Sequence, residues 1–466
     1  MHLLRVVGYG CVLPLLLFSA KGSAPRRQTE RSFGRHSGGA LDTEPVLREF
    51  LGNEENQRER DKAQISRIHA LEKNGTGSLT ELSGFLKDPH RPVRVEAVNA
   101  IVRVGSTASL DPLISATHDT DPEVRVRATD GIVNVYVPGY VANSGLSGYF
   151  TRGLRQVKSF FSARNDKVID DDVKVREDVG PAIAEEVNFS NDMAARSNAA
   201  LAAGILRLRV AVPALMQALH AKDNDLIFES LVALQKIHDP SAGEGVGFLV
   251  RDLDERTQVT ALETVGVLHS TQAAADVRYA LGNARDLKVK RATLSALAML
   301  ALPEDRTIFR QYVMNSDPAL RAAALEGLGR LREPEDTPTL QTSYDEANAD
   351  WRIHLAAAFA LVYEGNVSTE EFSPLLYLVE NLNSRQRADT ANTYLKELIN
   401  RQEVRKNLPK TLENSTKTQK LALCWIFGES HSDDLLPALK RLASDSDGEI
   451  EIAAKRAEHV LETRRE

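Results

Sequence analysis

The chain has 466 residues, about three times the size of a typical single domain, so one compact core is not expected. Hydrophobic residues make up 42% of it and charged residues 26%, which excludes a wholly disordered chain. Only two cysteines are present, Cys11 and Cys424, which excludes a disulfide scaffold. The net charge of −7 gives no support to nucleic-acid binding, which normally requires a basic face.

Residues 1–24 have the pattern of a secretory signal peptide. A short start with Arg5 precedes the apolar core Val6–Phe18, and small residues follow up to Ala24. The core is shorter than the roughly 20 residues of a spanning helix, and an uncleaved anchor is the alternative. Cys11 lies inside the core instead of just after it, which argues against a lipoprotein site. We therefore expect a secreted or periplasmic protein whose mature form keeps one thiol.

Two segments separate this leader from the rest of the chain. Residues 25–40 hold four arginines among Gly and Ser, and this composition predicts a disordered basic tail. The alternative is an arm that touches anionic lipid or a partner. Residues 41–77 are expected to form an N-terminal helical cap.

The remainder of the chain is organised by a period of about 31 residues. Val93–Ile101, Val124–Ile132 and Leu320–Leu328 align directly: each has an aliphatic residue, then Arg, then a small residue three positions later. Between Arg196 and Arg352 the equivalent positions keep an almost constant spacing over five steps, which chance does not sustain. With degenerate copies included, the equivalent positions are Arg94, Arg125, Arg196, Ile227, Gln258, Lys290, Arg321, Arg352, one near Arg387, Lys420 and Glu451.

Within one period the pattern is that of a helix pair. In Val212–Ile237, Pro213 starts a first helix and Asp223 precedes a second, each with apolar residues at helical spacing. Asp recurs four residues before the Arg-equivalent position, where its carboxylate would cap the second helix. These residues are Asp121, Asp192, Asp223, Asp254, Asp286, Asp317 and Asp447. Small residues recur at Ala97, Ala128, Ala199, Ala261 and Ala324, which would let neighbouring helices approach closely.

A helix pair of this size cannot bury its apolar face alone, whereas stacked pairs can. No window shows sustained alternation of period two, so no sheet is expected. We therefore predict an all-α fold, a right-handed α-solenoid of about eleven stacked helix pairs. Repeats 1–2 would occupy residues 78–135 and repeats 3–11 residues 179–466.

The pattern Asp-Pro-x-Val-Arg-x-x-Ala, carried by Asp121–Ala128 and, with Leu for Val, by Asp317–Ala324, resembles the HEAT-like repeats of the phycobilisome-lyase type. The resemblance covers about residues 79–461 and is specific for fold and weak for function. It implies a structural ladder between neighbouring repeats, and the alternative is an Arg row facing an acidic ligand. The ladder residues would be Arg94, Asp121, Arg125, Asp192, Arg196, Asp317, Arg321 and Arg352.

One insertion, residues 136–178, breaks the period. It is rich in aromatic residues, and Phe150, Leu154, Val157 and Phe161 would share one face of a helix. One hypothesis is that this helix docks a protein partner or touches a membrane surface. The other is that its aromatics fold back over the edge between repeats two and three. The candidate partner-binding residues are Tyr140, Tyr149, Phe150, Arg152, Leu154, Arg155, Val157, Lys158, Phe160 and Phe161.

Motifs of known catalytic or metal chemistry are missing from the sequence. None of the eleven His residues is followed by Glu, and there is no Cys-x-x-Cys, Walker or Gly-x-Ser-x-Gly motif. The glycines of Gly243–Gly247 are interpreted as structural. His238 and His269 lie one period apart and are interpreted as surface histidines, and a shared metal site is the alternative. Cys424 lies among apolar residues and is interpreted as a buried, inert thiol. We expect no cofactor and no metal.

The leading hypothesis is a non-catalytic, extracytoplasmic scaffold that binds a protein partner through an extended solenoid surface and the 136–178 insertion. An enzyme or enzyme subunit related to HEAT-repeat lyases or oxidoreductases is the first alternative. A protein associated with a membrane surface is the second. Nucleic acid is not an expected partner.

Overall fold

The computed structural model describes residues 44–141, 168–170 and 173–463. By its internal contacts the chain divides into two units, residues 1–57 and 58–466, and helix α1 (Glu44–Glu72) begins in the first and ends in the second. The predicted signal peptide, the basic tail and most of the insertion lie outside the described residues.

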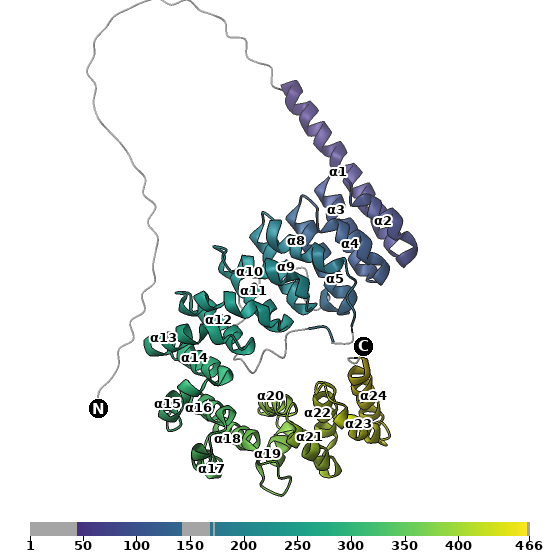
Figure 1. Ribbon diagram of the computed structural model, residues 1–466. Coiled ribbons are helices and arrows are strands. Elements are labelled where there is room, and N and C mark those ends of the chain that lie inside the picture. The colour runs from purple at the N-terminus through teal and green to yellow at the C-terminus, as the bar shows by residue number, and fades with distance from the viewer. Residues whose placement is uncertain (1–43, 142–167, 171–172, 464–466) are drawn as a thin grey trace, which may run out of the picture. The chain divides into compact units, whose positions relative to one another are not determined.

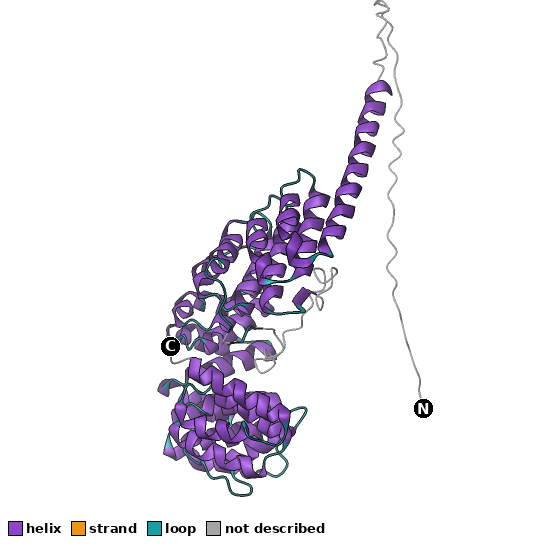
Figure 2. Cartoon of the chain, turned by 90° about the vertical axis from the view of Figure 1, so that its right-hand side faces the viewer, coloured by secondary structure: helices purple, strands orange, loops and turns teal. Residues whose placement is uncertain are grey.

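The second unit is built from helices alone as far as the structure describes it (Figure 2). The described residues between 79 and 463 form eleven helix pairs, in agreement with the predicted all-α solenoid. Figure 1 shows the stacked pairs in chain order. The first elements of the pairs are α2 (Leu79–Phe85), α4 (Leu110–Ala116), α8 (Val179–Phe189), α10 (Val212–Ala218), the 3₁₀ helix η7 (Gly247–Arg251), α13 (Ala274–Asn283), α15 (Arg306–Tyr312), α17 (Thr337–Asp345), α19 (Pro374–Glu380), α21 (Gln402–Asn407) and α23 (Leu436–Leu442).

The second helices are longer and stack on one another in chain order. They are α3 (Arg91–Val104), α5 (Pro122–Tyr136), α9 (Met193–Ile205), α11 (Asn224–Ile237), α12 (Glu255–Val267), α14 (Leu287–Leu300), α16 (Pro318–Leu331), α18 (Trp351–Glu364), α20 (Ala388–Leu398), α22 (Lys417–Gly428) and α24 (Gly448–Thr463). None of the helices in the described part of the chain combines the length and apolar character needed to cross a membrane.

Aspartates start the second helices as the sequence predicts. All seven predicted Asp side chains accept a backbone N–H from the first turn, as when Asp192 accepts from Ala195 at 2.8 Å. This satisfies donors that have no partner within the helix. The chain direction at each loop is therefore fixed by a local interaction that repeats along the solenoid.

The second helices also share a backbone conformation at their carboxyl ends, where a residue with positive φ recurs. Arg207, His238, His269, Ala301 and Arg332 each follow a second helix with φ between 47° and 59°. Gly105 and Gly365 hold the same place after α3 and α18. His238 and His269 thus occupy equivalent corners, as their spacing indicates.

The core consists of two clusters of buried apolar residues that meet at α18. Ile353, Ala356 and Leu361 belong to the cluster of the preceding repeats. Leu355 and Phe359, on another face of the same helix, belong to the cluster of the following repeats. The five predicted small residues, Ala97, Ala128, Ala199, Ala261 and Ala324, are all fully buried.

Backbones approach closely where side chains are small. A Cβ at Gly329 would lie 2.4 Å from the Cα of Ala360, and one at Gly204 would lie 2.7 Å from the Cα of Ala233. Neither site can accept a side chain without moving the neighbouring helix. The distance between neighbouring second helices therefore depends on small residues as much as on apolar ones.

The left-handed residue after α14 gives a test of this repeated ending. Ala301 has φ 47° and ψ 49°, a conformation that costs a residue with a Cβ roughly 1–2 kcal/mol. Ala301→Gly relieves that strain and loses part of the gain to the entropy of the unfolded chain. We expect the midpoint of thermal unfolding to rise by about 1–2 °C. Ala292→Gly, inside α14, should lower it. Equal shifts for the two variants in a thermal melt would contradict this explanation.

Candidate functional site

Two adjoining cavities of about 1060 Å³ and 940 Å³ lie among the second helices of the second unit. We call them together the inner channel. Residues shared by both cavities come from the segment before α8, from the ends of α9 and α11, and from α20 and α22. They are Val168, Ile169, Asp170, Arg207, His238, Lys396 and Glu429.

One part of the inner channel is apolar. Trp425 of α22 and Ile452 of α24 line it, and their side chains are 44% and 70% exposed. Val267 of α12 and Val460 of α24 complete this part of the wall. Large apolar side chains exposed in a concave surface are typical of binding sites.

Charged side chains border the apolar part. The Lys396 ammonium lies 3.7 Å from the centre of the Trp425 ring and 3.1 Å from a carboxylate oxygen of Glu429. The ammonium thereby makes a cation–π contact and an ion pair at the same time. Glu449 and Arg456 of α24 also line this part of the channel. The rim therefore carries both signs of charge.

Residues 168–170, the first described residues after the gap in the insertion, contact two distant parts of the inner channel. The backbone N–H of Ile169 donates to the carbonyl of Ile205 at the end of α9, at 2.9 Å, and its side chain is buried. The next residue, Asp170, forms an ion pair with Arg456, which lies 286 positions later. Early and late repeats thus meet at this segment.

A buried polar network connects the channel wall to the core. Arg330 of α16 donates to both oxygens of Glu397 at 2.8 and 2.7 Å, and to Glu326 at 3.2 Å. The Tyr394 hydroxyl donates to Glu326 at 2.6 Å. Burial raises the pKa of Glu326 although Arg330 and Tyr394 favour its charged form. Because Glu397 lines the inner channel, this network joins α16, α20 and the channel across the boundary between the two core clusters.

A second carboxyl group with a raised pKa lies near the channel. Glu263 of α12 is half-buried one turn before the channel residue Val267, on the same face of the helix. Its removal from water raises its pKa to about 8. The group therefore titrates near neutral pH.

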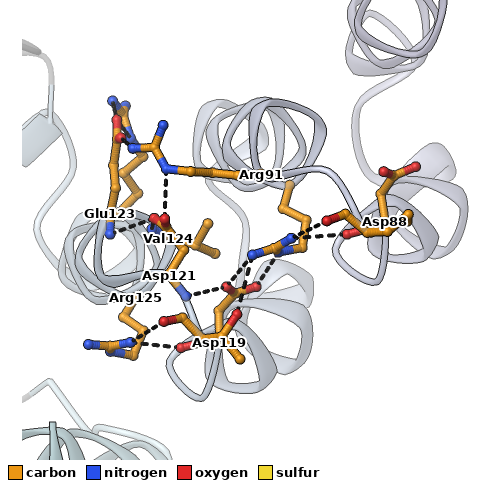
Figure 3. Close-up of polar contacts among 11 residues, drawn as sticks. Asp88, Arg91, Asp119, Asp121, Glu123, Val124 and Arg125 are labelled. Atoms are coloured by element: carbon orange, nitrogen blue, oxygen red, sulfur yellow. Dashed lines mark hydrogen bonds and ion pairs between the residues drawn. The ribbon is translucent and has the colours of Figure 1, made fainter. Parts of the chain in front are cut away.

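Three of the predicted ladder arginines bond to the following repeat. Arg94 donates at 2.8 and 3.0 Å to both oxygens of Asp119, which is labelled in Figure 3. Arg125 donates to Glu186 at 2.9 Å, and Arg321 donates to Glu346. Arg94 and Arg125 also donate to backbone carbonyls of the loop before their own helix. At Arg94 and Arg125, one side chain therefore stabilises the loop before its own helix and also bonds to the next repeat.

The other predicted ladder residues act more locally. Arg196 donates to the Val187 carbonyl at 2.6 Å within its own repeat, and Arg352 pairs with Asp350 at the start of its own helix. His354, two residues later, contacts the loop carbonyl of Glu346 at 2.6 Å and takes the ladder position there. The predicted aspartates cap their helices, and two of them also receive an arginine from the preceding repeat. These pairs are Arg91 with Asp121 and Arg291 with Asp317.

The first elements of the pairs carry a second ladder that the sequence analysis missed. Arg278 donates to Asp305 of the next repeat at 2.6 Å, and Arg306 and Arg310 donate to Asp336 at 2.7 and 2.6 Å. Asp305 and Asp336 are 0% and 1% exposed. Two Pro-Glu-Asp sequences one period apart, beginning at Pro303 and Pro334, were a signal that could have found it.

Nine of the ten candidate partner-binding residues of the insertion lie outside the described residues. They are Tyr149, Phe150, Arg152, Leu154, Arg155, Val157, Lys158, Phe160 and Phe161. The tenth, Tyr140, is buried in the core.

Within the described part of the chain no group of three or more His, Cys, Asp or Glu side chains could hold a metal ion. Cys424 is buried, which raises the pKa of its thiol to about 11.

Comparison with known proteins agrees with this architecture. A family model described as HEAT repeats matches residues 283–361. No curated protein matches the chain. The second unit is an all-α solenoid by its helices, and the match over residues 283–361 agrees with the HEAT-like resemblance expected from the sequence.

The solved structures that match the chain have low sequence identity to it. The complex of CpcE and CpcF of phycocyanin lyase from Nostoc sp. PCC7120 is 17% identical, covers 57% of this chain and 91% of that chain, and has a TM-score of 0.35. Importin beta is 12% identical, with 90% and 66% covered and a TM-score of 0.37. An engineered protein is 15% identical, with 86% and 99% covered and a TM-score of 0.31.

The second ladder predicts a large effect of one buried carboxylate. Asp305→Ala removes the partner of Arg278 from a fully buried position and should lower the free energy of unfolding by about 2–3 kcal/mol. The matched control is Glu304→Ala, because Glu304 is 60% exposed and also approaches Arg278. We expect less than about 0.5 kcal/mol from it. Denaturant melts of both variants measure the difference, and similar losses would contradict the ladder.

The raised pKa of Glu263 predicts a dependence of stability on pH. The folded protein holds a proton on Glu263 up to about pH 8, whereas the unfolded chain releases it near pH 4.5, so stability falls as pH rises between these values. Glu263→Gln removes this loss. Between pH 5 and pH 8 the midpoint of thermal unfolding should fall by about 1–3 °C less in the variant than in the wild type. The exposed Glu244→Gln is the control and should follow the wild type.

Proposed function

We propose that this protein is an extracytoplasmic scaffold that binds a protein partner in the inner channel and through the 136–178 insertion. The observation that supports it most is the exposure of Trp425 and Ile452 on the wall of a concave channel. A solenoid offers such surfaces because successive repeats place equivalent side chains side by side.

The composition of the channel favours a polypeptide as the ligand. Binding energy at protein interfaces concentrates in buried aromatic and aliphatic side chains, while a polar rim excludes water and fixes orientation. Trp425 and Ile452 supply the apolar centre. Lys396, Glu429 and Glu449 supply a rim with both signs of charge, which can pair with a mixed peptide sequence.

Export is the second part of the proposal, and the pattern of residues 1–24 supports it. Intact mass measurement of the protein from its native cells, after separation of the envelope from the cytoplasm, tests it. A cytoplasmic protein that keeps the whole of segment 1–24 would contradict the proposal.

The binding proposal predicts which exposed apolar residues matter. The mature protein is first used for affinity capture from its native envelope, and the captured partner is then titrated against purified variants. Trp425→Ala and Ile452→Asp should each weaken binding by at least about tenfold, because each removes apolar contact at the centre of the channel.

Leu253→Asp is the matched control for these variants. Leu253 is fully exposed in the loop between η7 and α12 and does not line the channel, so its substitution should leave the affinity unchanged. Circular dichroism verifies that all variants are folded. Unchanged affinity in both channel variants would place the binding surface elsewhere and overturn the proposal.

A further inference from the structure

We propose that a pocket between the end of α16, α17 and the end of α18 binds a small zwitterion, an amino acid or a dipeptide. Glu364 would receive the ammonium group of this ligand and Arg332 its carboxylate. The pocket shares no lining residue with the inner channel. The inference therefore goes beyond the proposed function and does not depend on it.

The pocket has the size and lining of a small-molecule site. Its volume is about 720 Å³, and the three helices around it follow one another in the stack (Figure 1). Leu331 of α16 and Leu361 of α18 give it apolar walls. Thr337 and Gln341 of α17 and Asn366 after α18 add polar groups. Apolar walls with a few convergent polar groups are typical of ligand sites.

Glu364, the last residue of α18, has one carboxylate oxygen without a partner. Its Oε2 accepts the Thr337 hydroxyl at 2.8 Å, whereas its Oε1 is enclosed and has no hydrogen-bond partner within the protein. Burial raises the pKa of this carboxyl, and the Thr337 bond opposes the rise. The terminal torsion of a glutamate is soft, so a small rotation turns the carboxylate toward a donor in the pocket.

Arg332 supplies the positive charge of the pocket. It directly follows α16, and its side chain is exposed and forms no hydrogen bond or ion pair in the described part of the chain. Its charge favours the ionised form of Glu364. The pKa of the exposed Glu403 on α21 is lowered by a backbone hydrogen bond and then by the charges of Arg401 and Arg332. Arg332 thus acts on both carboxyls through space without bonding to either.

The other acidic group beside the pocket is already paired. Asp336, whose charge adds to the rise in the pKa of Glu364 caused by burial, accepts from Arg306 and Arg310 at 2.7 and 2.6 Å. The charged residues in the lining itself are Glu364 and Arg332. They line one pocket and form no ion pair with each other.

Opposite charges that line one pocket without pairing favour a ligand that carries both charges. An ammonium group can donate to the carboxylate of Glu364, and a carboxylate can accept two bonds from the guanidinium of Arg332. The last backbone carbonyls of α18 carry partial negative charge, which strengthens the preference for an ammonium group near Glu364. Leu331 and Leu361 suit an apolar side chain between the two ends.

Isothermal titration calorimetry of the mature chain with L-leucine and with L-leucyl-L-leucine tests the inference. We expect the better ligand to bind with a dissociation constant of about 1 mM or lower. Tighter binding of leucine would assign the pocket to a free amino acid, and tighter binding of the dipeptide would assign it to a short peptide. No saturable binding of either would overturn the inference.

Two analogues of leucine separate its charges without any change to the protein. Isoamylamine lacks the carboxylate and isocaproate lacks the ammonium group. Each should bind at least about tenfold more weakly than the better zwitterion, because each leaves one charged residue of the pocket without a partner. An analogue that binds as tightly as the zwitterion would contradict the assignment of two charges.

Glu364→Gln and Arg332→Gln each remove one charge from the pocket. Each should weaken binding of the better zwitterion by at least about tenfold. Glu371→Gln is the matched control, because Glu371 is exposed in the loop after α18 and does not line the pocket, and it should bind as the wild type does. Thermal melts verify that the variants are folded. Unchanged affinity in both pocket variants would overturn the inference.

Discussion

A pair of short helices cannot bury its own apolar face, and the rest of this structure depends on that constraint. Each second helix must pack on the next, so positions such as Gly329 and Gly204 carry no side chain against the neighbouring helix. Polar side chains must then find partners one repeat away. Two ion pairs show this: Arg94 pairs with Asp119, and Arg278 pairs with Asp305. Each pair links two neighbouring repeats, and neither repeat would be stable alone.

At α18, where the two apolar clusters meet, polar bonds as well as apolar packing hold neighbouring repeats together. Phe359 packs on Tyr394 of α20, while the Arg330 guanidinium of α16 reaches past it to Glu397. Burial of a charged pair is favourable only when the remaining donors and acceptors are also satisfied. Here Arg330 has Glu326, Glu397 and the Ala298 carbonyl as partners. A hydrogen-bonded polar network thus joins the two apolar clusters, and it ends at the channel.

Local features were predictable from the sequence, and distant contacts were not. Asp192 caps α9 because the carboxylate and the N–H it accepts are three residues apart, a relation that the sequence displays directly. The inner channel depends on curvature, which brings Asp170 beside Arg456 across 286 residues. The repeat period of the sequence does not predict this contact between Asp170 and Arg456. Trp425 is one aromatic residue in an apolar run by sequence, and only the stacked repeats show that its ring is exposed.

The position of the channel also has an electrostatic consequence. Its lining includes residues at the carboxyl ends of α9 and α11, such as Arg207 and His238, where the last backbone carbonyls of a helix carry partial negative charge. The structure uses one of these carbonyls already, since Ile205 accepts from the Ile169 N–H. Because Arg207 and Lys396 line the channel beside Glu397 and Glu429, these helix ends favour an occupant that brings backbone donors and charges of both signs. A net charge of −7 for the whole chain does not reveal this preference, because it arises from where the helices end.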